Sequence, residues 1–262
     1  MNIIDFENIN VGYDEKIILK NVNLKIKQGE HWAILGANGS GKSTLMKVIQ
    51  SEIHPRRTHS YKKEILGKET YSIFELRKKL GIITNDLHNH FAKEASYFNG
   101  FEVVLSGHYS SVGIFTHQDF TKEQIIKAKK VLKFLEIEDL KDKKVASMST
   151  GQLRKCIIGR ALIHEPKAFI LDEPTVGLDI KAQINFIKIL KKLSLSSSII
   201  LVTHYLEEIF EEIKNVALIY NNTVYKSGKK EEILTSENLS EIFDTKLSIK
   251  EKNNRYFLEE IL

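Results

Sequence analysis

A glycine-rich loop between two contrasting segments constrains this chain most. Residues 32–35 form an apolar run typical of a buried strand, residues 43–50 have helical character, and G-A-N-G-S-G-K-S-T lies between them at 36–44. This order fits the P-loop pattern G-x-x-x-x-G-K-[ST], in which a loop between strand and helix surrounds phosphate groups. The glycines permit positive φ angles, so successive N–H groups can encircle phosphate oxygens at the positive end of a helix. We therefore predict a nucleotide phosphate cradle that consists of Gly36, Asn38, Gly39, Ser40, Gly41, Lys42, Ser43 and Thr44.

Two side chains at the end of this loop have distinct chemical roles. The Lys42 ammonium can pair with the β and γ phosphates of a nucleotide. The neighbouring Ser43 hydroxyl can ligate Mg²⁺. The loop thus predicts a site for a nucleotide with its metal ion.

A second strand candidate ends in two acids. The apolar residues 168–171 precede Asp172 and Glu173, and ligands of open α/β sheets gather at the carboxyl ends of strands. Asp172 would hold Mg²⁺, directly or through water, and Glu173 would act on the attacking water as general base. An apolar strand that ends in two acids is equally typical of a solvated strand end, so this pair alone decides nothing.

A second anion site is predicted at residues 149–152. Ser149 and Gln152 have the S-x-x-Q spacing of a capping box, with Gly151 between them, ahead of a helix. The simplest interpretation is a helix start, but a capped helix N-terminus also attracts anions. One nucleotide hardly needs two phosphate cradles, unless the second cradle serves a nucleotide held by another copy of the chain.

Apolar runs recur in an order typical of α/β proteins. Residues 3–11 and 17–26 favour a small antiparallel sheet, and later strand candidates at 81–84, 168–172, 198–203 and 216–220 mostly precede helical segments. The fold class expected is therefore α/β: a P-loop NTPase core with a parallel-rich sheet, an N-terminal antiparallel β subdomain and an inserted helical lobe. We expect one domain with a core lobe at 1–84 and 166–221, a helical lobe at 85–165 and a β/α appendage at 222–262, which begins with a hairpin near 225–228.

Taken in order, five motifs resemble the nucleotide-binding subunit of the ATP-binding cassette (ABC) family over nearly the whole chain. After the loop at 36–44, residues 148–152 stand where the family has its LSGGQ-like signature. Asp172 and Glu173 stand for Walker B and the catalytic glutamate. Residues 177–179 resemble the D-loop, which includes Asp179, and His204 resembles the switch histidine. Tyr13, in an early turn, is similar to the aromatic residue that stacks on adenine.

This resemblance implies an Mg²⁺-dependent ATPase that works as a head-to-tail homodimer. ATP would lie between the P-loop of one subunit and the signature of the other, which accounts for the second phosphate cradle. His204 would touch the γ-phosphate or the water and would share the catalytic role with Glu173. The nucleotide-binding residues expected outside the loop are Tyr13, Ser149, Gly151, Gln152 and Asp179.

Two positions depart from the family pattern. Thr150 replaces the first glycine of the signature pair, while Ser149 and Gly151 remain. Asn85 stands where the Q-loop glutamine is expected, after the strand candidate at 81–84. Since Asn is one methylene shorter than Gln, we expect Asn85 to reach the metal through a bridging water.

Composition and charge limit the classes of partner that we expect for this chain. The net charge is +5, but the eight lysines between residues 122 and 144 alternate with five acids and with apolar residues at helical spacing. This pattern is typical of a solvated helix face, so we expect no direct nucleic-acid contact. The longest apolar run, 216–220, is far below the roughly 20 residues of a membrane span. Acidic residues stand where a signal peptide would be basic, and the lone Cys156 suits a reducing compartment as a buried hydrophobe.

These features favour an ATP-hydrolysing subunit that powers a separate membrane permease. It would be cytoplasmic and peripheral on the inner face of the membrane. Residues 103–109 and the signature look most like cassettes that import iron chelates and molybdate. The alternative is a soluble, non-transport ABC ATPase that acts on ribosomes, nucleic acid or cofactor assembly.

Overall fold

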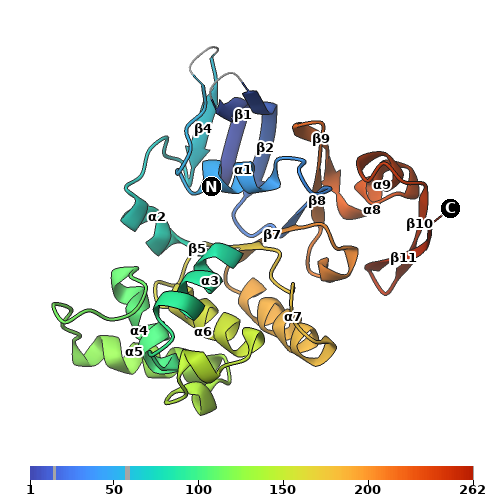
Figure 1. The fold of residues 1–262 in the computed structure, drawn as a ribbon. Coiled ribbons are helices and arrows are strands. Elements are labelled where there is room, and N and C mark those ends of the chain that lie inside the picture. Colours follow the sequence, from blue (N-terminus) through green and yellow to red (C-terminus); the bar gives the residue numbers. More distant parts are fainter. Residues whose placement is uncertain (14–15, 57–59, 262) are drawn as a thin grey trace.

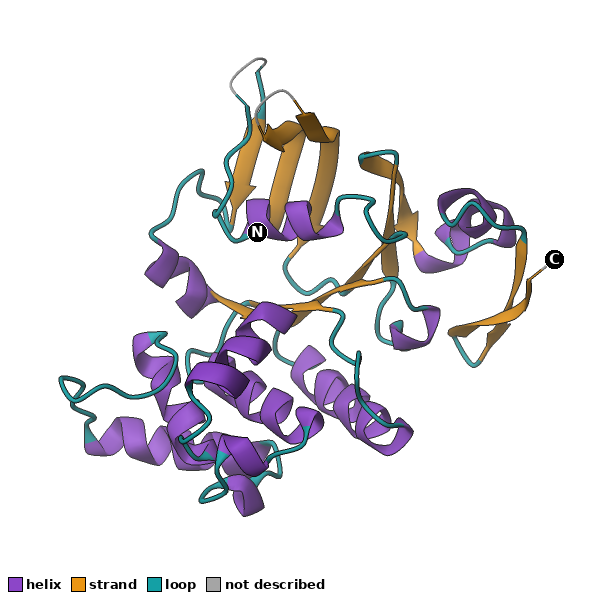
Figure 2. Ribbon diagram, viewed as in Figure 1, coloured by secondary structure: helices purple, strands orange, loops and turns teal. Residues whose placement is uncertain are grey.

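The strands form three sheets, and the largest crosses the middle of the molecule (Figures 1 and 2). The computed structural model describes residues 1–13, 16–56 and 60–261. The central sheet has the order β5-β6-β7-β3-β8-β9, in which β9 alone runs antiparallel to its neighbour. Its strands are β3 (Trp32–Leu35), β5 (Leu80–Ile83), β6 (Ala168–Asp172), β7 (Ser198–Thr203), β8 (Asn215–Tyr220) and β9 (Thr223–Lys229). The predicted parallel-rich α/β core is confirmed.

Both faces of the central sheet are buried. Alternate residues of a strand point to opposite faces, so in β3 Trp32 and Ile34 join one apolar cluster while Ala33 and Leu35 join the other. β6, β7 and β8 divide their side chains in the same way. A sheet covered on both faces needs continuous apolar strands, which is the pattern of the short apolar runs in the sequence.

One of these clusters lies under the N-terminal antiparallel sheet. That sheet has the order β2-β1-β4, from β1 (Asn2–Tyr13), β2 (Lys16–Lys27) and β4 (Lys62–Ile65). Helix α1 (Lys42–Ile49) lies beside it and buries four apolar side chains in the same cluster, and α2 (Ile73–Lys79) leads into β5. The strands at 3–11 and 17–26 are confirmed within β1 and β2, whereas β4 and α2 are not in the sequence-based expectation.

Helices and short 3₁₀ turns occupy the region between β5 and β6. The helices are α3 (Asn85–Glu94), α4 (Gly100–Leu105), α5 (Lys122–Phe134) and α6 (Thr150–Leu162), and we call residues 85–162 the helical lobe. With α7 (Ile180–Ser194) they pack on the other face of the central sheet (Figure 1). Cys156 is buried there, and burial raises the pKa of its thiol to about 12, which confirms its expected role as a small hydrophobe.

The C-terminal region differs in one detail from the expectation. The hairpin predicted near 225–228 turns at Asn221 and Asn222, which both have positive φ, and residues 225–228 lie in its second strand. The prediction missed the turn because Asn-Asn tolerates left-handed backbone as well as a glycine turn does. Beyond it come α8 (Lys230–Ile233), α9 (Ser236–Ile242) and the hairpin of β10 (Leu247–Lys252) with β11 (Arg255–Ile261).

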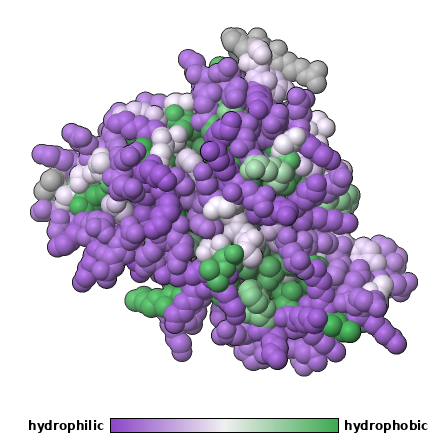
Figure 3. Space-filling view, turned by 180° about the vertical axis from the view of Figure 1, so that it is seen from behind, coloured by the Kyte–Doolittle hydropathy of each residue, from purple (hydrophilic) through white to green (hydrophobic). Residues whose placement is uncertain are grey.

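The surface is mostly polar. In the view of Figure 3, hydrophobic residues gather in the lower half, the half in which Figure 1 has the helical lobe and α7. Among the large apolar side chains that these elements expose are Ile126 on α5 and Ile180 and Ile184 on α7. Within the part of the chain that the structure describes, no helix is both long and apolar enough to cross a membrane.

A buried carboxylate ties the three strands of the N-terminal sheet together. Asp5 on β1 is 3 % exposed and accepts hydrogen bonds from Lys62 Nζ on β4 at 2.7 Å and from Asn2 Nδ2 at 2.8 Å. Lys25 Nζ on β2 lies 3.5 Å from the same oxygen. The hydrogen bond from Lys62 lowers the pKa of Asp5, and burial opposes it less strongly. A carboxyl group with a lowered folded pKa stabilises the fold above its unfolded pKa, and this contribution is lost as pH falls through the folded value.

We expect Asp5→Asn to lower the free energy of unfolding at pH 7 by about 1 kcal/mol, because solvent screens the half-exposed lysines. The difference from wild type should shrink below pH 4 as the wild-type carboxylate becomes protonated. Urea unfolding at pH 7 and pH 3 measures both values, with the exposed Asp142→Asn as control. Equal stability of Asp5→Asn and wild type at pH 7 would contradict the role of this ion pair.

Candidate functional site

The loop predicted to hold phosphate connects β3 to α1. Gly39 and Gly41 have φ angles of +79° and +107°, which residues with a Cβ rarely adopt. A Cβ on Gly41 would also lie 2.7 Å from Leu19 Cδ2. Gly41 is the N-cap of α1 and no side chain caps this helix end, so its first N–H groups are available to an anion.

Lys42 is buried and curls back onto its own loop. Its Nζ donates to the carbonyl oxygens of Gly36 at 2.8 Å and Ala37 at 2.9 Å. Burial lowers the pKa of Lys42, while the carboxylates of Glu173 and Asp172 act in the opposite direction. A buried ammonium held by neutral carbonyls is well placed to exchange them for phosphate oxygens.

A cavity of about 270 Å³ opens at this loop. Its lining residues are Ile18, Asn38, Gly39, Gly41, Lys42, Ser43, Thr44 and Glu173. Ser40 Oγ is buried without a hydrogen-bond partner among the described residues, and such an atom normally finds a partner in the functional state. The cavity therefore combines backbone donors, one ammonium and hydroxyl groups at a single helix end.

Strand register brings the acids and the histidine to the same edge of the sheet. Leu35, the last residue of β3, pairs with Thr203 of β7, and Asp172 of β6 pairs with Val202. Since parallel strands that end in register present their following residues together, His204 meets the segment after Asp172. His204 Nδ1 lies 2.7 Å from Glu173 Oε1.

This contact defines the state of both groups. A carboxylate can only accept, so the imidazole carries its proton on Nδ1 and leaves Nε2 to face another ligand. Burial, and after it the nearby Glu173 carboxylate, raises the pKa of Asp172 to about 6, although Lys42 acts in the opposite direction. A carboxyl group in such surroundings gains most from a bound cation.

The capping box predicted at residues 149–152 is confirmed at the start of α6. Ser149 Oγ accepts from Gln152 N at 3.3 Å and Gln152 Oε1 accepts from Ser149 N at 3.0 Å, so α6 begins with the expected capping box. Gly151 is buried against α7, where a Cβ would lie 3.3 Å from Ala182 Cβ. Ser149, Gly151 and Gln152 do not line the cavity at Lys42. Within one chain the two predicted phosphate cradles are therefore separate.

The remaining predicted residues lie in different surroundings. Asp179 is the N-cap of α7 and accepts from Ala182 N at 2.7 Å. Asn85 begins α3, and its Oδ1 accepts from an Arg154 guanidinium nitrogen at 2.7 Å. The side chain of Tyr13 falls outside the described part of the chain.

Two buried charged residues near the acids are absent from the sequence-based expectation. Arg154 on α6 is 4 % exposed and donates to backbone oxygens after Asp172, and Glu208, 3 % exposed, accepts from Thr175 on the same segment. Burial raises the pKa of Glu208, and hydrogen bonds from Thr175 and Thr203 oppose the rise. No spacing in the sequence signals these contacts, because each joins residues at least 19 positions apart.

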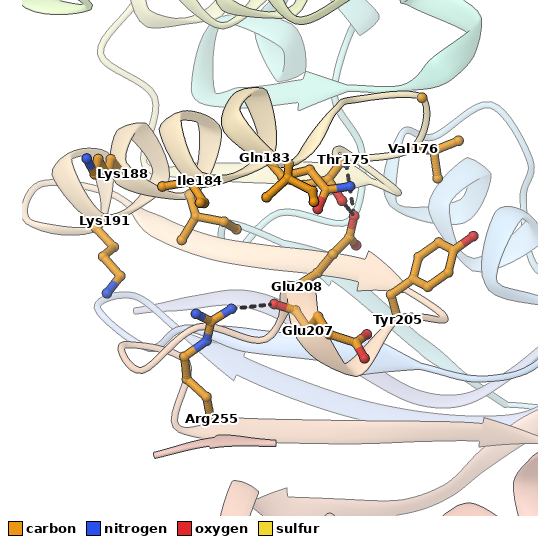
Figure 4. A pocket seen from close by; sticks show the side chains of 13 residues that line it. Thr175, Val176, Gln183, Ile184, Lys188, Lys191, Tyr205, Glu207, Glu208 and Arg255 are labelled. Carbon is orange, nitrogen blue, oxygen red and sulfur yellow. Dashed lines mark hydrogen bonds between the residues drawn. The ribbon is translucent and has the colours of Figure 1, made fainter. Parts of the chain in front are cut away.

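A larger groove lies on the far side of the same segment (Figure 4). It measures about 540 Å³ and is lined by residues 175–177 together with side chains of α7, the turn after His204 and Arg255. Figure 4 shows Glu208 hydrogen-bonded to Thr175 among the lining residues, and isoleucines of α7 also line the groove. It contains no glycine-rich helix start, so the smaller cavity at Lys42 is the better nucleotide site.

The sequence of this chain is similar to those of known proteins. The family model described as ABC transporter matches residues 19–176. The uncharacterized ABC transporter ATP-binding protein YlmA of Bacillus subtilis is 32% identical over 98% of this chain and 96% of its own length. YmeB of Lactococcus lactis, described in the same terms, is 30% identical over 98% of both chains.

Solved structures show the same fold. A putative metal-chelate type ABC transporter in an inward-facing conformation matches with a TM-score of 0.80 at 24% identity, over 100% of this chain and 98% of its own. CbiO1 of Clostridium perfringens, part of the cbiONQ transporter complex, matches with 0.73 at 29% identity, over 92% and 93%. The cassette MJ0796, a dimer bound to ADP and Pi, matches with 0.67 at 26% identity, over 86% and 98%.

The glycine loop, the strand-end acids and the capped signature helix thus occur together in a chain that such relatives match along nearly its full length. The chain belongs to the ABC transporter family, as an ATP-binding cassette.

Proposed function

We propose that this chain hydrolyses ATP with Mg²⁺ in a head-to-tail homodimer and powers a separate membrane permease, in the direction of import. The observation that carries the proposal is that the two predicted phosphate cradles lie apart within one chain. The phosphate cavity at Lys42 and the Glu173–His204 pair lie together, whereas the signature cap at Ser149 does not line that cavity.

The residues at the cavity suit a nucleotide with its metal ion. Lys42, freed from the loop carbonyls, would pair with the β and γ phosphates. The Ser43 hydroxyl and the Asp172 carboxylate are hard oxygen ligands of the kind that Mg²⁺ prefers. When bound, Mg²⁺ would neutralise charge on the phosphate oxygens. The water-bridged metal contact of Asn85 stays a prediction: Oδ1 already accepts a hydrogen bond from Arg154, so the bridging water would use its second lone pair.

Glu173 and His204 would carry the hydrolytic step. Glu173 lines the cavity, so its carboxylate can accept a proton from the water that attacks the γ-phosphate. The His204 Nδ1–H orients that carboxylate, and Nε2 remains for the phosphate or the water. Because His204 directly follows β7, its contact with Glu173 couples the position of that strand to the orientation of the proposed base.

The second half of the site would come from the partner subunit. The exposed Ser149 lies at a helix N-terminus, where the N–H groups and the helix dipole favour an anion. In a head-to-tail pair each signature would face the γ-phosphate held by the other chain, and Asp179 would lie near the shared nucleotide. Hydrolysis would remove the group that bridges both subunits.

A permease would bind at a groove beside Asn85. The groove measures about 320 Å³ and is lined by residues from both lobes, among them Thr84, Asp86, Leu87 and His90. A helix of the permease seated there would press on the start of α3 and on Asn85. The CbiO1 match supports a transporter complex, and such binding would place the chain at the inner face of the membrane. The resemblance of residues 103–109 to import cassettes supports the direction.

Glu173→Gln should bind ATP and hydrolyse it about 10² to 10⁴ times more slowly than wild type, because the amide keeps its shape and loses basicity. With hydrolysis blocked, the ATP-bound dimer should accumulate in sedimentation velocity. Glu165→Gln, three residues before β6 begins, serves as control. A rate of Glu173→Gln equal to that of the control would exclude Glu173 as the base.

Mixing two inactive variants should restore activity if the sites are shared. Lys42→Ala should lose tight ATP binding and Ser149→Arg should block the partner's site, so each alone is inactive. An equimolar mixture should recover about a quarter of the wild-type rate, since half of randomly paired dimers carry one intact site. Sites contained within single chains predict no recovery, so an inactive mixture of folded variants would argue against the head-to-tail arrangement.

Co-purification should test the permease. We expect a membrane protein encoded beside this chain to be retained by wild type and lost with His90→Trp, which fills the groove at an exposed position. His117→Trp, exposed outside the groove residues, should retain it. Thermal unfolding checks that both variants fold. Retention of ribosomes or nucleic acid by wild type, without any permease, would favour the non-transport alternative.

A further inference from the structure

The backbone turn that carries the proposed base is strained. Glu173 has a φ of +46°, in the left-handed region that a residue with a side chain rarely adopts. Glu173 N donates to Val202 O at 2.8 Å, which fixes the entry to the turn. Strained backbone of this kind persists only where surrounding contacts hold it. The contacts of the residues after Glu173 therefore fix the backbone that carries this carboxylate, while His204 orients its oxygens.

Arg154 holds the turn from the side of the helical lobe. One terminal nitrogen of its guanidinium donates to Pro174 O and lies 3.5 Å from Glu173 O. The other terminal nitrogen donates to Asn85 Oδ1 at 2.7 Å. A buried guanidinium loses its hydrogen bonds with water, and the hydrogen bonds with these oxygens replace them. Arg154 thus connects three elements: α6, the start of α3 and the turn after β6.

Glu208 holds the next residue of the turn. Its Oε1 accepts from Thr175 N at 2.9 Å and also from Thr175 Oγ1. The carboxylate lies in the turn that follows His204, and its negative charge stabilises the Arg154 cation. Figure 4 shows this pairing among the side chains that line the large groove. Two buried residues of opposite charge therefore bind consecutive backbone units, Pro174 and Thr175.

We propose that Arg154 and Glu208 are positioning residues for Glu173, and that Asn85 connects them to the groove beside α3. The inference rests on the proposed role of Glu173 as base. In this inference the Asn85 amide oxygen accepts from the Arg154 guanidinium, and that guanidinium donates to the turn after Glu173. A shift of α3 against α6 would then move the backbone of Glu173 and Pro174.

The kinetic consequence is specific. Arg154 and Glu208 do not line the phosphate cavity, so their loss should leave ATP affinity intact. A misplaced base slows the chemical step, since a displacement of about 1 Å can reduce a rate 10²-fold. We expect Arg154→Gln to lower kcat about ten- to hundredfold with little change in KM. Glu208→Gln, which keeps one acceptor for Thr175, should have a smaller effect of the same kind.

Arg160→Gln is the matched control. Arg160 is another buried arginine of α6, but its Nε donates to Ser111 O inside the helical lobe. It lines the groove beside α3, so kcat is compared in the isolated cassette without a permease. Both substitutions remove a buried guanidinium from the same helix, so a purely structural effect should lower the melting temperature in both. Only the Arg154 variant should also lower kcat.

A double-mutant cycle with Glu173→Gln tests whether Arg154 acts through the base. If it does, Arg154→Gln should cause no further loss of the residual rate when Glu173 is already Gln. Fully additive losses, or a kcat for Arg154→Gln equal to that of Arg160→Gln, would overturn the inference. If Arg154→Gln does not fold, Arg154→Lys and Glu208→Gln replace it in the same cycle. A normal rate for Glu173→Gln itself would instead overturn the assigned base, so the two failures are distinguishable.

Discussion

Burial of both faces of the central sheet is the constraint on which the rest of the structure depends. Each of β3, β6, β7 and β8 sends alternate side chains into two separate apolar clusters. The strands can satisfy both clusters only in a narrow range of registers, because a slip of one residue would exchange the two faces. The same register aligns the ends of β3, β6 and β7, and so brings the glycine loop, the acids and His204 together.

The site itself is held by buried charge rather than by apolar packing. Lys42, Arg154 and Glu208 are each less than 7 % exposed, and each forms at least one hydrogen bond with a backbone group of the loop or of the turn after Asp172. Charges in such places are costly unless they are fully bonded. These hydrogen bonds therefore hold the loop and the turn in one conformation. A phosphate that binds Lys42 would replace the hydrogen bonds of its ammonium with the loop carbonyls.

Separation of the two phosphate cradles explains why we propose a site shared by two chains. The N-terminal end of α1, with its free N–H groups, faces the cavity. The N-terminal end of α6 lies on the helical lobe, where the exposed Ser149 caps it. Arg154 lies on the helix that begins at Ser149, and it donates to the turn after Glu173, which lines the cavity. Movement of the lobe would therefore alter the proposed base and the proposed signature together.

The sequence by itself determined the parallel-rich core, the phosphate loop, the capping box and the resemblance that the family matches confirm, because these depend on local spacing and periodicity. It did not predict β4, α2 or the turn at Asn221, where short elements carry weak periodic signals. Only the tertiary structure decided that Asn85 holds Arg154 and that Arg154 and Glu208 bracket the turn. Those contacts join residues 19 to 69 positions apart, and packing of the helical lobe against the sheet, rather than any sequence spacing, brings them within hydrogen-bond distance.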